Sequence, residues 1–222
     1  MANAQTAVHG HGPGASLAST IALWRQPWAG LRDRGEGGTA LAADSGQRVA
    51  TILSHRFGGD ASAWQVTRDL HGRPMLAAAH GLDISISHAG NCWLLAVSHC
   101  SRRVGVDIET PRPLPRALAL AERYFPAEEV ALLTRLAPQS RGHAFLRLWC
   151  AREAILKAHG RGIAFGLSRL QLDLTPTHLR LLECDPELGA ASDWRLREFV
   201  PKCGMLGMLA WRGPPALVRG CE

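Results

Sequence analysis

The stretch Val104-Gly105-Val106-Asp107-Ile108-Glu109 predicts both a central strand and the place where the charged chemistry of this chain lies. Its β-branched residues favour a strand, and the period of two puts Asp107 and Glu109 on one face and the apolar side chains on the other. One or two carboxylates, with room left for water and phosphate oxygens, are the usual ligands of Mg²⁺. Gly105 lies inside the strand, which indicates that another backbone or a ligand comes close there.

A second stretch, Trp149-Cys150-Ala151-Arg152-Glu153-Ala154-Ile155-Leu156-Lys157, belongs to a predicted helix from His143 to His159, a segment without Pro or Gly. Glu153 and Lys157 are one turn apart, and on an exposed face such a pair is an ordinary surface salt bridge. Apolar residues share this arc of the helix, so we expect the pair to be buried and functional. A third carboxylate and a lysine that face two Mg²⁺ ligands form a site for handling phosphates.

Together these stretches resemble the two signature motifs of the Sfp-type 4′-phosphopantetheinyl transferases, (I/V)G(I/V)D(I/V)E and (F/W)(S/C/T)xKE(S/A)xxK. Ile84-Ser85-Ile86-Ser87-His88-Ala89-Gly90 is similar to a third family element, and Gly72-Arg73-Pro74 is similar to the family's G(K/R)P. The resemblance runs from residue 48 to residue 167 with the motifs in the family's order. It departs at Arg152, where the family usually has Lys, and the two side chains differ in reach and donor geometry.

The resemblance implies an enzyme, a holo-[carrier protein] synthase, of polyketide, nonribosomal peptide or fatty acid biosynthesis. Such an enzyme transfers the 4′-phosphopantetheine arm of coenzyme A to the serine of an apo acyl or peptidyl carrier protein and releases 3′,5′-ADP. It also implies that Asp107, Glu109 and Glu153 hold Mg²⁺ and that Lys157 stabilises charge on the transferring phosphate. Glu153, directly or through a bound water, is then the candidate base for the serine hydroxyl. The expected catalytic residues are Glu153, Lys157 and Asp107.

The same resemblance implies a set of coenzyme A contacts. Arg48 opens a predicted helix that runs to Phe57, and it aligns with a family arginine that grips the 3′-phosphate; an ordinary exposed helix arginine is the other interpretation. The turn at 72–74 corresponds to a loop that runs against the adenine, and the pair at 87–88 corresponds to donors to phosphate oxygens. The expected contacts are Arg48, Gly72, Arg73, Pro74, Ser87, His88 and Lys157.

The pattern of elements predicts an α+β fold in which a helix followed by an antiparallel meander occurs twice. Strands are expected at 21–25, 82–87, 92–98, 103–109, 170–174, 179–183, 194–200 and 205–211. Residues 27–46 are expected to be loop-like, and 116–136 to be helical with a break near Pro126.

The family adds a pseudo-twofold arrangement of two subdomains, each a helix packed on an antiparallel sheet, with the active site in the cleft between them. We expect a flexible tail at 1–16, an N-terminal subdomain at 17–110 with the nucleotide contacts, and a C-terminal subdomain at 111–222 with the motif helix and the carrier-protein contacts. Such a pseudodimer is expected to be a monomer.

Composition limits the class of protein. The chain has 222 residues, 46% hydrophobic and 20% charged, which indicates a globular protein with an ample core. We see neither a signal peptide nor an apolar run near the roughly 20 residues of a membrane-spanning helix, so a cytoplasmic location is expected. The six cysteines form no C-x-x-C pair, which favours reduced thiols and gives zinc no support.

The charge balance favours an anionic partner, because 25 basic residues face 19 acidic ones for a net charge of +6. The basic residues are scattered and are not interleaved with aromatic ones, so nucleic acid is not expected. Coenzyme A and an acidic carrier protein explain the charge. Nearly all the basic residues are Arg, and Lys157 and Lys202 are the only lysines.

Two other functions fit part of the pattern. A Mg²⁺-dependent nuclease of the D…ExK kind also combines acidic ligands with a lysine, but its Glu and Lys are two residues apart on a strand, whereas Glu153 and Lys157 are four apart on a helix. A non-catalytic module that binds anions leaves the converging carboxylates unexplained.

Overall fold

The structure, a computed structural model, describes residues 20–27, 37–77, 81–99, 102–202 and 204–221, and it is an α+β fold as predicted. The helices are α1 (Gly37–Phe57), α2 (Ala117–Tyr124), α3 (Ala127–Arg135) and α4 (Pro138–His159). The strands are β1 (Thr20–Pro27), β2 (Val66–Arg68), β3 (Pro74–Leu76), β4 (Leu82–Ala89), β5 (Cys92–His99), β6 (Val104–Glu109), β7 (Leu170–Leu174), β8 (Leu179–Cys184), β9 (Trp194–Phe199), β10 (Leu206–Arg212) and β11 (Leu217–Cys221). The predicted tail at 1–16 lies outside the described residues. In the described part of the chain, no helix is long and apolar enough to cross a membrane.

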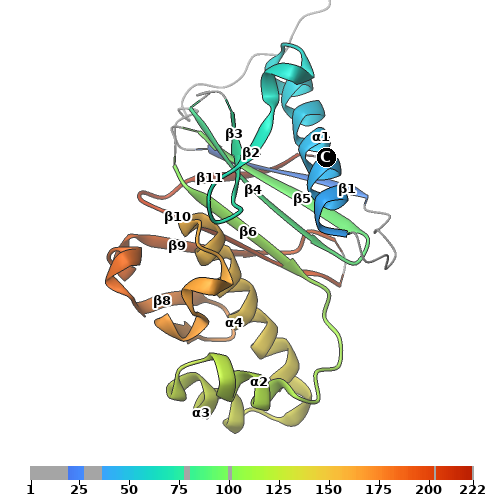
Figure 1. Cartoon of the computed structure of the whole chain (residues 1–222). Helices are drawn as coiled ribbons and strands as arrows, with labels where there is room; N and C mark the ends of the chain where they lie inside the picture. Colours follow the sequence, from blue (N-terminus) through green and yellow to red (C-terminus); the bar gives the residue numbers. More distant parts are fainter. Residues whose placement is uncertain (1–19, 28–36, 78–80, 100–101, 203, 222) are drawn as a thin grey trace, which may run out of the picture.

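Two sheets form the middle of the molecule, with α1 beside one and α4 beside the other (Figure 1). The first sheet has the strand order β11-β1-β5-β4, and the second has the order β6-β10-β9. Side chains of β5 alternate between two hydrophobic clusters: Trp93 and Leu95 pack with α1, whereas Leu94 and Ala96 pack with residues of β6 and β10. Both faces of this strand are therefore buried, which explains its continuous apolar sequence.

The predicted meander of β4, β5 and β6 is wrong in one respect, because β6 pairs antiparallel with β10 instead of β5. Side chains of β4 join the two sheets at this point: Val104 N donates to Asp83 Oδ2 (2.8 Å), Val106 N to Ser85 Oγ (3.0 Å) and Ile108 N to Ser87 Oγ (3.2 Å). The period of two that puts these acceptors on one face of β4 was available in the sequence. Their use in place of a backbone ladder depends on the tertiary fold.

The strand ladders cross the predicted boundary between residues 110 and 111. Strand β6 belongs to the sheet of β9 and β10, and β11 pairs parallel with β1, with Ile21 opposite Val218. The subdomain limits at 17–110 and 111–222 stay a prediction. The sequence reading missed β11, β2 and β3, which are short strands or lie at a sheet edge.

Helix α1 begins at Gly37, so the expectation of a loop up to residue 46 is wrong for residues 37–46; residues 28–36 lie outside the described part. Gly, Ser and Asp in this segment favoured a loop. Tertiary contact outweighs that local preference: Ser45 is buried and accepts a hydrogen bond from Trp93 Nε1 (3.3 Å) of β5.

Helix α4 also begins earlier than predicted, at Pro138. Backbone N–H groups in the first turn of a helix have no partner within the helix, so the N–H group that proline lacks is not needed there. Helix α4 packs across β6 at Gly105. A Cβ atom on Gly105 would lie 1.9 Å from the carbonyl oxygen of Ala154 and 2.5 Å from the nitrogen of Ala158. The close backbone approach predicted from this glycine is thus confirmed, and it brings the two sequence motifs together.

Candidate active site

Lys157 of α4, Asp107 of β6 and Ser87 of β4 meet where the helix crosses the strand. Lys157 Nζ lies 2.7 Å from Asp107 Oδ1 and 3.2 Å from Ser87 Oγ, and Ser87 Oγ donates to Asp107 Oδ1 (2.9 Å). The side chains of Asp107 and Lys157 are 8% and 29% exposed. The ordinary interpretation of Lys157, a surface salt bridge with Glu153, is therefore wrong, because its ion pair joins two elements that are fifty residues apart.

The three predicted carboxylates line one cavity of about 660 Å³ together with Lys157. Asp107 and Glu109 come from β6 and Glu153 comes from α4, so the strand and the helix face each other across this space as the two motifs predicted. Glu109 Oε2 also lies 3.5 Å from a guanidinium nitrogen of Arg112, which is more exposed.

Burial and crowding of like charges alter the acidity of this site. Burial raises the pKa of Glu153 from 4.5 to about 7; Lys157 opposes the rise, and Asp107 and Glu109 add to it. Burial, and then the charge of Asp107, raises the pKa of Glu109. Burial acts to lower the pKa of Lys157, but the charge and the hydrogen bond of Asp107, together with the charge of Glu153, oppose it, and the pKa is raised, which keeps the ammonium charged.

One observation indicates that the carboxylates of this cavity suit Mg²⁺. Asp107 Oδ2 is buried and has no hydrogen-bond partner in the structure, so it is available as a ligand. Carboxylate oxygens are the ligands that this ion prefers. Within the described residues, however, no group of three or more His, Cys, Asp or Glu side chains is already gathered closely enough to hold a metal. Lys157 supplies the positive charge beside Asp107.

A second cavity, of about 280 Å³, adjoins the first and contains most of the predicted coenzyme A contacts. Gly72, Arg73 and Pro74 line it, and His88 and Lys157 line both cavities. Gly72 has φ +84°, which confirms the predicted turn. Ser87 lines the first cavity, and its hydroxyl is engaged within the protein.

Two of the predicted contact residues have environments that the sequence did not reveal. Arg48 lies inside α1, so its placement at a helix start is wrong; it bonds Asp44 Oδ2 (2.9 Å), Gln26 Oε1 (3.3 Å) and the carbonyl of Pro27 (3.2 Å). Burial, and then the charge of Lys157, lowers the pKa of His88. Their contacts with coenzyme A stay predictions.

Arg152, the departure from the family motif, lines neither cavity. It is fully buried, lies over the ring of Phe125 with its carbon 4.0 Å from the centroid, and forms an ion pair with Glu129 (2.5 Å). It also donates to the carbonyls of Leu148, Leu167 and Leu170. Arg152 therefore ties α4 to α3 and β7. Glu129 of α3 is its buried counterion.

The cysteines with described side chains agree with the prediction of reduced thiols, since Cys92, Cys150 and Cys184 are free. Cys150 is the one beside the site. Burial raises the pKa of this thiol well above its ordinary range, and the charge of Asp107 adds to the effect. Cys150 is therefore a neutral thiol beside Asp107.

Comparison with known proteins identifies the class to which this fold and site belong. Residues 103–201 match the model of the 4′-phosphopantetheinyl transferase superfamily. The chain is 33% identical to the 4′-phosphopantetheinyl transferase HetI of Nostoc sp. strain PCC 7120 over 168 residues, 74% of this chain and 68% of that protein. It therefore belongs to the 4′-phosphopantetheinyl transferase superfamily, which confirms the resemblance drawn from the motifs.

Two further relatives support the Sfp-type character at lower identity or coverage. The chain is 35% identical to the 4′-phosphopantetheinyl transferase psf-1 of Bacillus pumilus over 98 residues, 44% of this chain and 40% of that protein. It is 24% identical to the 4′-phosphopantetheinyl transferase Sfp of Bacillus subtilis strain 168 over 152 residues, 62% of this chain and 66% of that protein. Both matches cover less than two thirds of the relative's length.

Proposed function

We propose that this protein transfers the 4′-phosphopantetheine arm of coenzyme A to the serine of an apo acyl or peptidyl carrier protein and releases 3′,5′-ADP. The observation that carries the proposal is the pair of adjoining cavities. One is lined by Asp107, Glu109 and Glu153, the other by the loop at 72–74, and Lys157 and His88 line both. An elongated ligand with a nucleotide at one end and a pyrophosphate in the middle suits this shape.

In this proposal the serine oxygen forms a bond to the phosphorus that carries the pantetheine arm, and the bond from that phosphorus to the 5′-phosphate oxygen of the nucleotide breaks. Glu153, directly or through a bound water, accepts the serine proton. Lys157, held 2.7 Å from Asp107, presents a fixed positive charge to the transferring phosphate.

Asp107, Glu109 and Glu153 are the residues that would hold Mg²⁺, with the buried free oxygen of Asp107 as the first ligand. The ion would supply charge neutralisation on the pyrophosphate. Ser87 contributes by fixing Asp107, to which its hydroxyl donates at 2.9 Å. His88 is proposed to bind phosphate oxygens of coenzyme A, the 3′-phosphate among them, since it lines both cavities.

The pseudo-twofold arrangement, the monomeric state and a cytoplasmic location belong to this proposal as well. An acidic carrier protein suits the net charge of +6 through complementary attraction. The nuclease alternative lacks support, because Glu153 and Lys157 lie on a helix and the chain belongs to a transferase family.

The proposal is tested by mixing the protein with coenzyme A, Mg²⁺ and a panel of apo carrier proteins and recording intact masses. One carrier should gain the mass of a single phosphopantetheine arm. The same carrier with its acceptor serine replaced by alanine is the matched control and should gain nothing. Absence of any mass gain across acyl and peptidyl carriers would contradict the proposal.

A further inference from the structure

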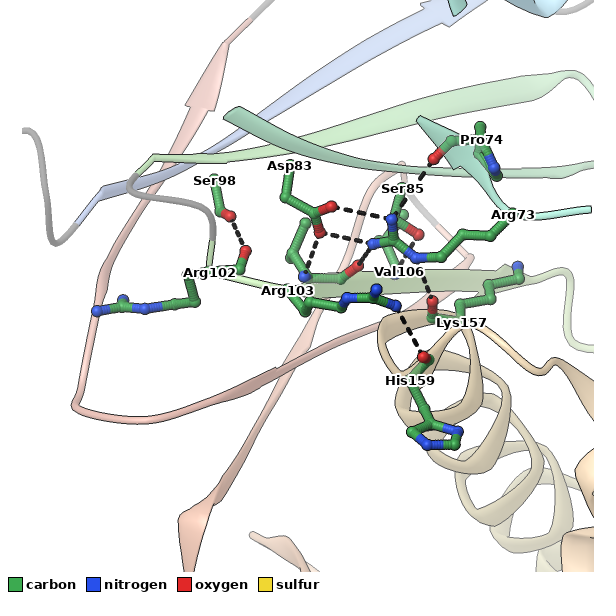
Figure 2. Close-up of polar contacts among 11 residues, drawn as sticks. Arg73, Pro74, Asp83, Ser85, Ser98, Arg102, Arg103, Val106, Lys157 and His159 are labelled. Carbon is green, nitrogen blue, oxygen red and sulfur yellow. Dashed lines mark hydrogen bonds and ion pairs between the residues drawn. The ribbon is translucent and has the colours of Figure 1, made fainter. Parts of the chain in front are cut away.

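The C-terminal end of α4 is held by two arginines from distant parts of the chain. Carbonyl groups in the last turn of a helix have no partner within the helix and need donors from elsewhere. Arg73 Nε donates to the carbonyl of Lys157 (2.9 Å), and Arg103 donates to the carbonyl of His159 (2.9 Å), as Figure 2 shows. The turn of α4 that carries Lys157 is thus fixed by the strand region on which it packs.

Arg73 is itself fixed on every side. Its guanidinium forms two parallel hydrogen bonds with Asp83 of β4 (2.9 and 2.6 Å) and also donates to the carbonyls of Val104 (3.2 Å) and Pro74 (3.5 Å). The residue is only 6% exposed. All the donor nitrogens of the guanidinium are therefore engaged within the protein, and a contact with a ligand phosphate would require breaking one of these bonds.

Asp83 connects this arrangement to the strand that carries the acidic residues. It accepts from Arg73 and from the backbone nitrogen of Val104 (2.8 Å), so one carboxylate joins the 72–74 loop, β4 and the start of β6. Asp107 lies on the same strand β6, and Lys157 lies on the helix turn that Arg73 holds. Loss of the hydrogen bond from Arg73 to the carbonyl of Lys157, or of the pair between Arg73 and Asp83, would change the position of Lys157 relative to Asp107.

We propose that Arg73 and Asp83 form a positioning pair that sets the last turn of α4 against β6 and thereby holds the Lys157 ammonium beside Asp107. The inference rests on the proposed transfer function for its consequence in catalysis. The side chain of Arg73 then serves the helix, although the loop at 72–74 lines the smaller cavity. The Asp83 carboxylate neutralises the guanidinium, which also makes Arg73 a poor anchor for a phosphate.

The test compares Asp83→Asn and Arg73→Lys with a matched control, Asp173→Asn. Asp173 forms a pair of similar length with Arg180 (2.9 Å), but that pair joins β7 and β8 on the surface. Turnover, the dissociation constant of coenzyme A from calorimetry, and amide hydrogen exchange in the last turn of α4 are measured for each protein. Asp83→Asn keeps the shape of the side chain, and Arg73→Lys keeps the charge but loses the two parallel bonds.

We expect kcat to fall by about tenfold to a hundredfold in both variants, because small misplacement of a catalytic group is costly. The dissociation constant of coenzyme A should change by less than about threefold, and exchange in the last turn of α4 should become faster. The control should match the wild type in all three measurements. The two substitutions combined should cost little more than either alone, since they interrupt one unit.

Weaker coenzyme A binding with kcat and exchange preserved would overturn the inference and make Arg73 a ligand contact. Unchanged behaviour of both variants would also overturn it. Hydrogen exchange measures the opening of the last turn of α4 and needs no transfer reaction. If the wild type fails to modify a carrier, that result counts against the proposed transfer function, and the exchange rates of the variants still test the positioning role. If Asp83→Asn does not fold, Arg73→Lys, which keeps the positive charge, decides the outcome by the same three readings.

Discussion

Replacing Glu153 by Gln should stabilise the metal-free protein near neutral pH, although it removes the proposed base. Burial raises the pKa of this carboxyl from 4.5 to about 7 in the folded protein. Between those two values the folded state binds a proton that the unfolded state has lost, so stability falls as pH rises through this window. The fold therefore tolerates an ionised Glu153 at a cost, as sites built for chemistry often do.

The magnitude follows from the difference between the two pKa values, which corresponds to roughly 3 kcal/mol above pH 7. Urea unfolding of wild type and Glu153→Gln, in the presence of a chelator from about pH 5 to about pH 8, measures it. The curves should meet near the acid end and separate as pH rises. Glu183→Gln, at an exposed position on β8, is the matched control and should follow the wild type.

Mg²⁺ provides the second half of this experiment, because a ligand that binds only the folded state stabilises it by mass action. Added Mg²⁺ should raise the stability of the wild type more than that of Glu153→Gln and so narrow the gap between them. Curves that stay parallel over the whole pH range would refute the reasoning that Glu153 is destabilised by burial among carboxylates. An identical response of both proteins to Mg²⁺ would remove Glu153 from the metal site.

Three further substitutions test other contacts. Lys157→Ala should lower the rate of single-turnover transfer by at least about a hundredfold, and Lys157→Arg should restore little of that rate, because the ammonium is fixed beside Asp107. Near-normal transfer by Lys157→Ala would mean that the lysine is only structural. His88→Ala should weaken the binding of coenzyme A, measured by calorimetry, by about 1.5–3 kcal/mol, and that of dephospho-coenzyme A, which lacks the 3′-phosphate, by less. The affinity of the wild type for coenzyme A should rise as pH falls through the lowered pKa of His88. Equal losses for the two ligands would contradict the role of His88 as a phosphate contact. Gly105→Ala should cost at least about 3 kcal/mol in unfolding experiments, since its Cβ would lie 1.9 Å from the carbonyl oxygen of Ala154; a stable variant would mean that α4 does not pack this closely on β6.

The centre of the fold and of the site could be predicted from the sequence because short-range periodicity determines which side chains share a face. The period of two in β6 put Asp107 and Glu109 on the face that α4 covers, and Gly105 predicted the close approach of that helix. The period of α4 put Glu153 and Lys157 on the same side. The period of two in a strand and of 3.6 in a helix can be read from the sequence without knowledge of long-range contacts.

The parts that could not be predicted depend on pairing between residues far apart in the chain. Arg152 aligned with a motif lysine, yet its partner is Glu129 of α3, and the sequence gives no sign of that buried pair. Asp83 reads as one polar residue of an alternating strand, and its link to Arg73 follows only from the crossing of β4, β6 and α4. Burial of Ser45 against β5 likewise determines that α1 extends before residue 48.

The most direct test of the central claim is the stoichiometry of a single turnover of coenzyme A with an apo carrier and Mg²⁺. Wild-type protein should release one 3′,5′-ADP for each carrier that gains a phosphopantetheine arm, because attack by the serine and departure of the nucleotide are one displacement. Asp107→Asn, which keeps the shape of the side chain but removes its charge from the cavity of Glu109, Glu153 and Lys157, should reduce both products together by at least about a hundredfold. Equal turnover by wild type and Asp107→Asn, or release of 3′,5′-ADP without modification of the carrier, would contradict the account.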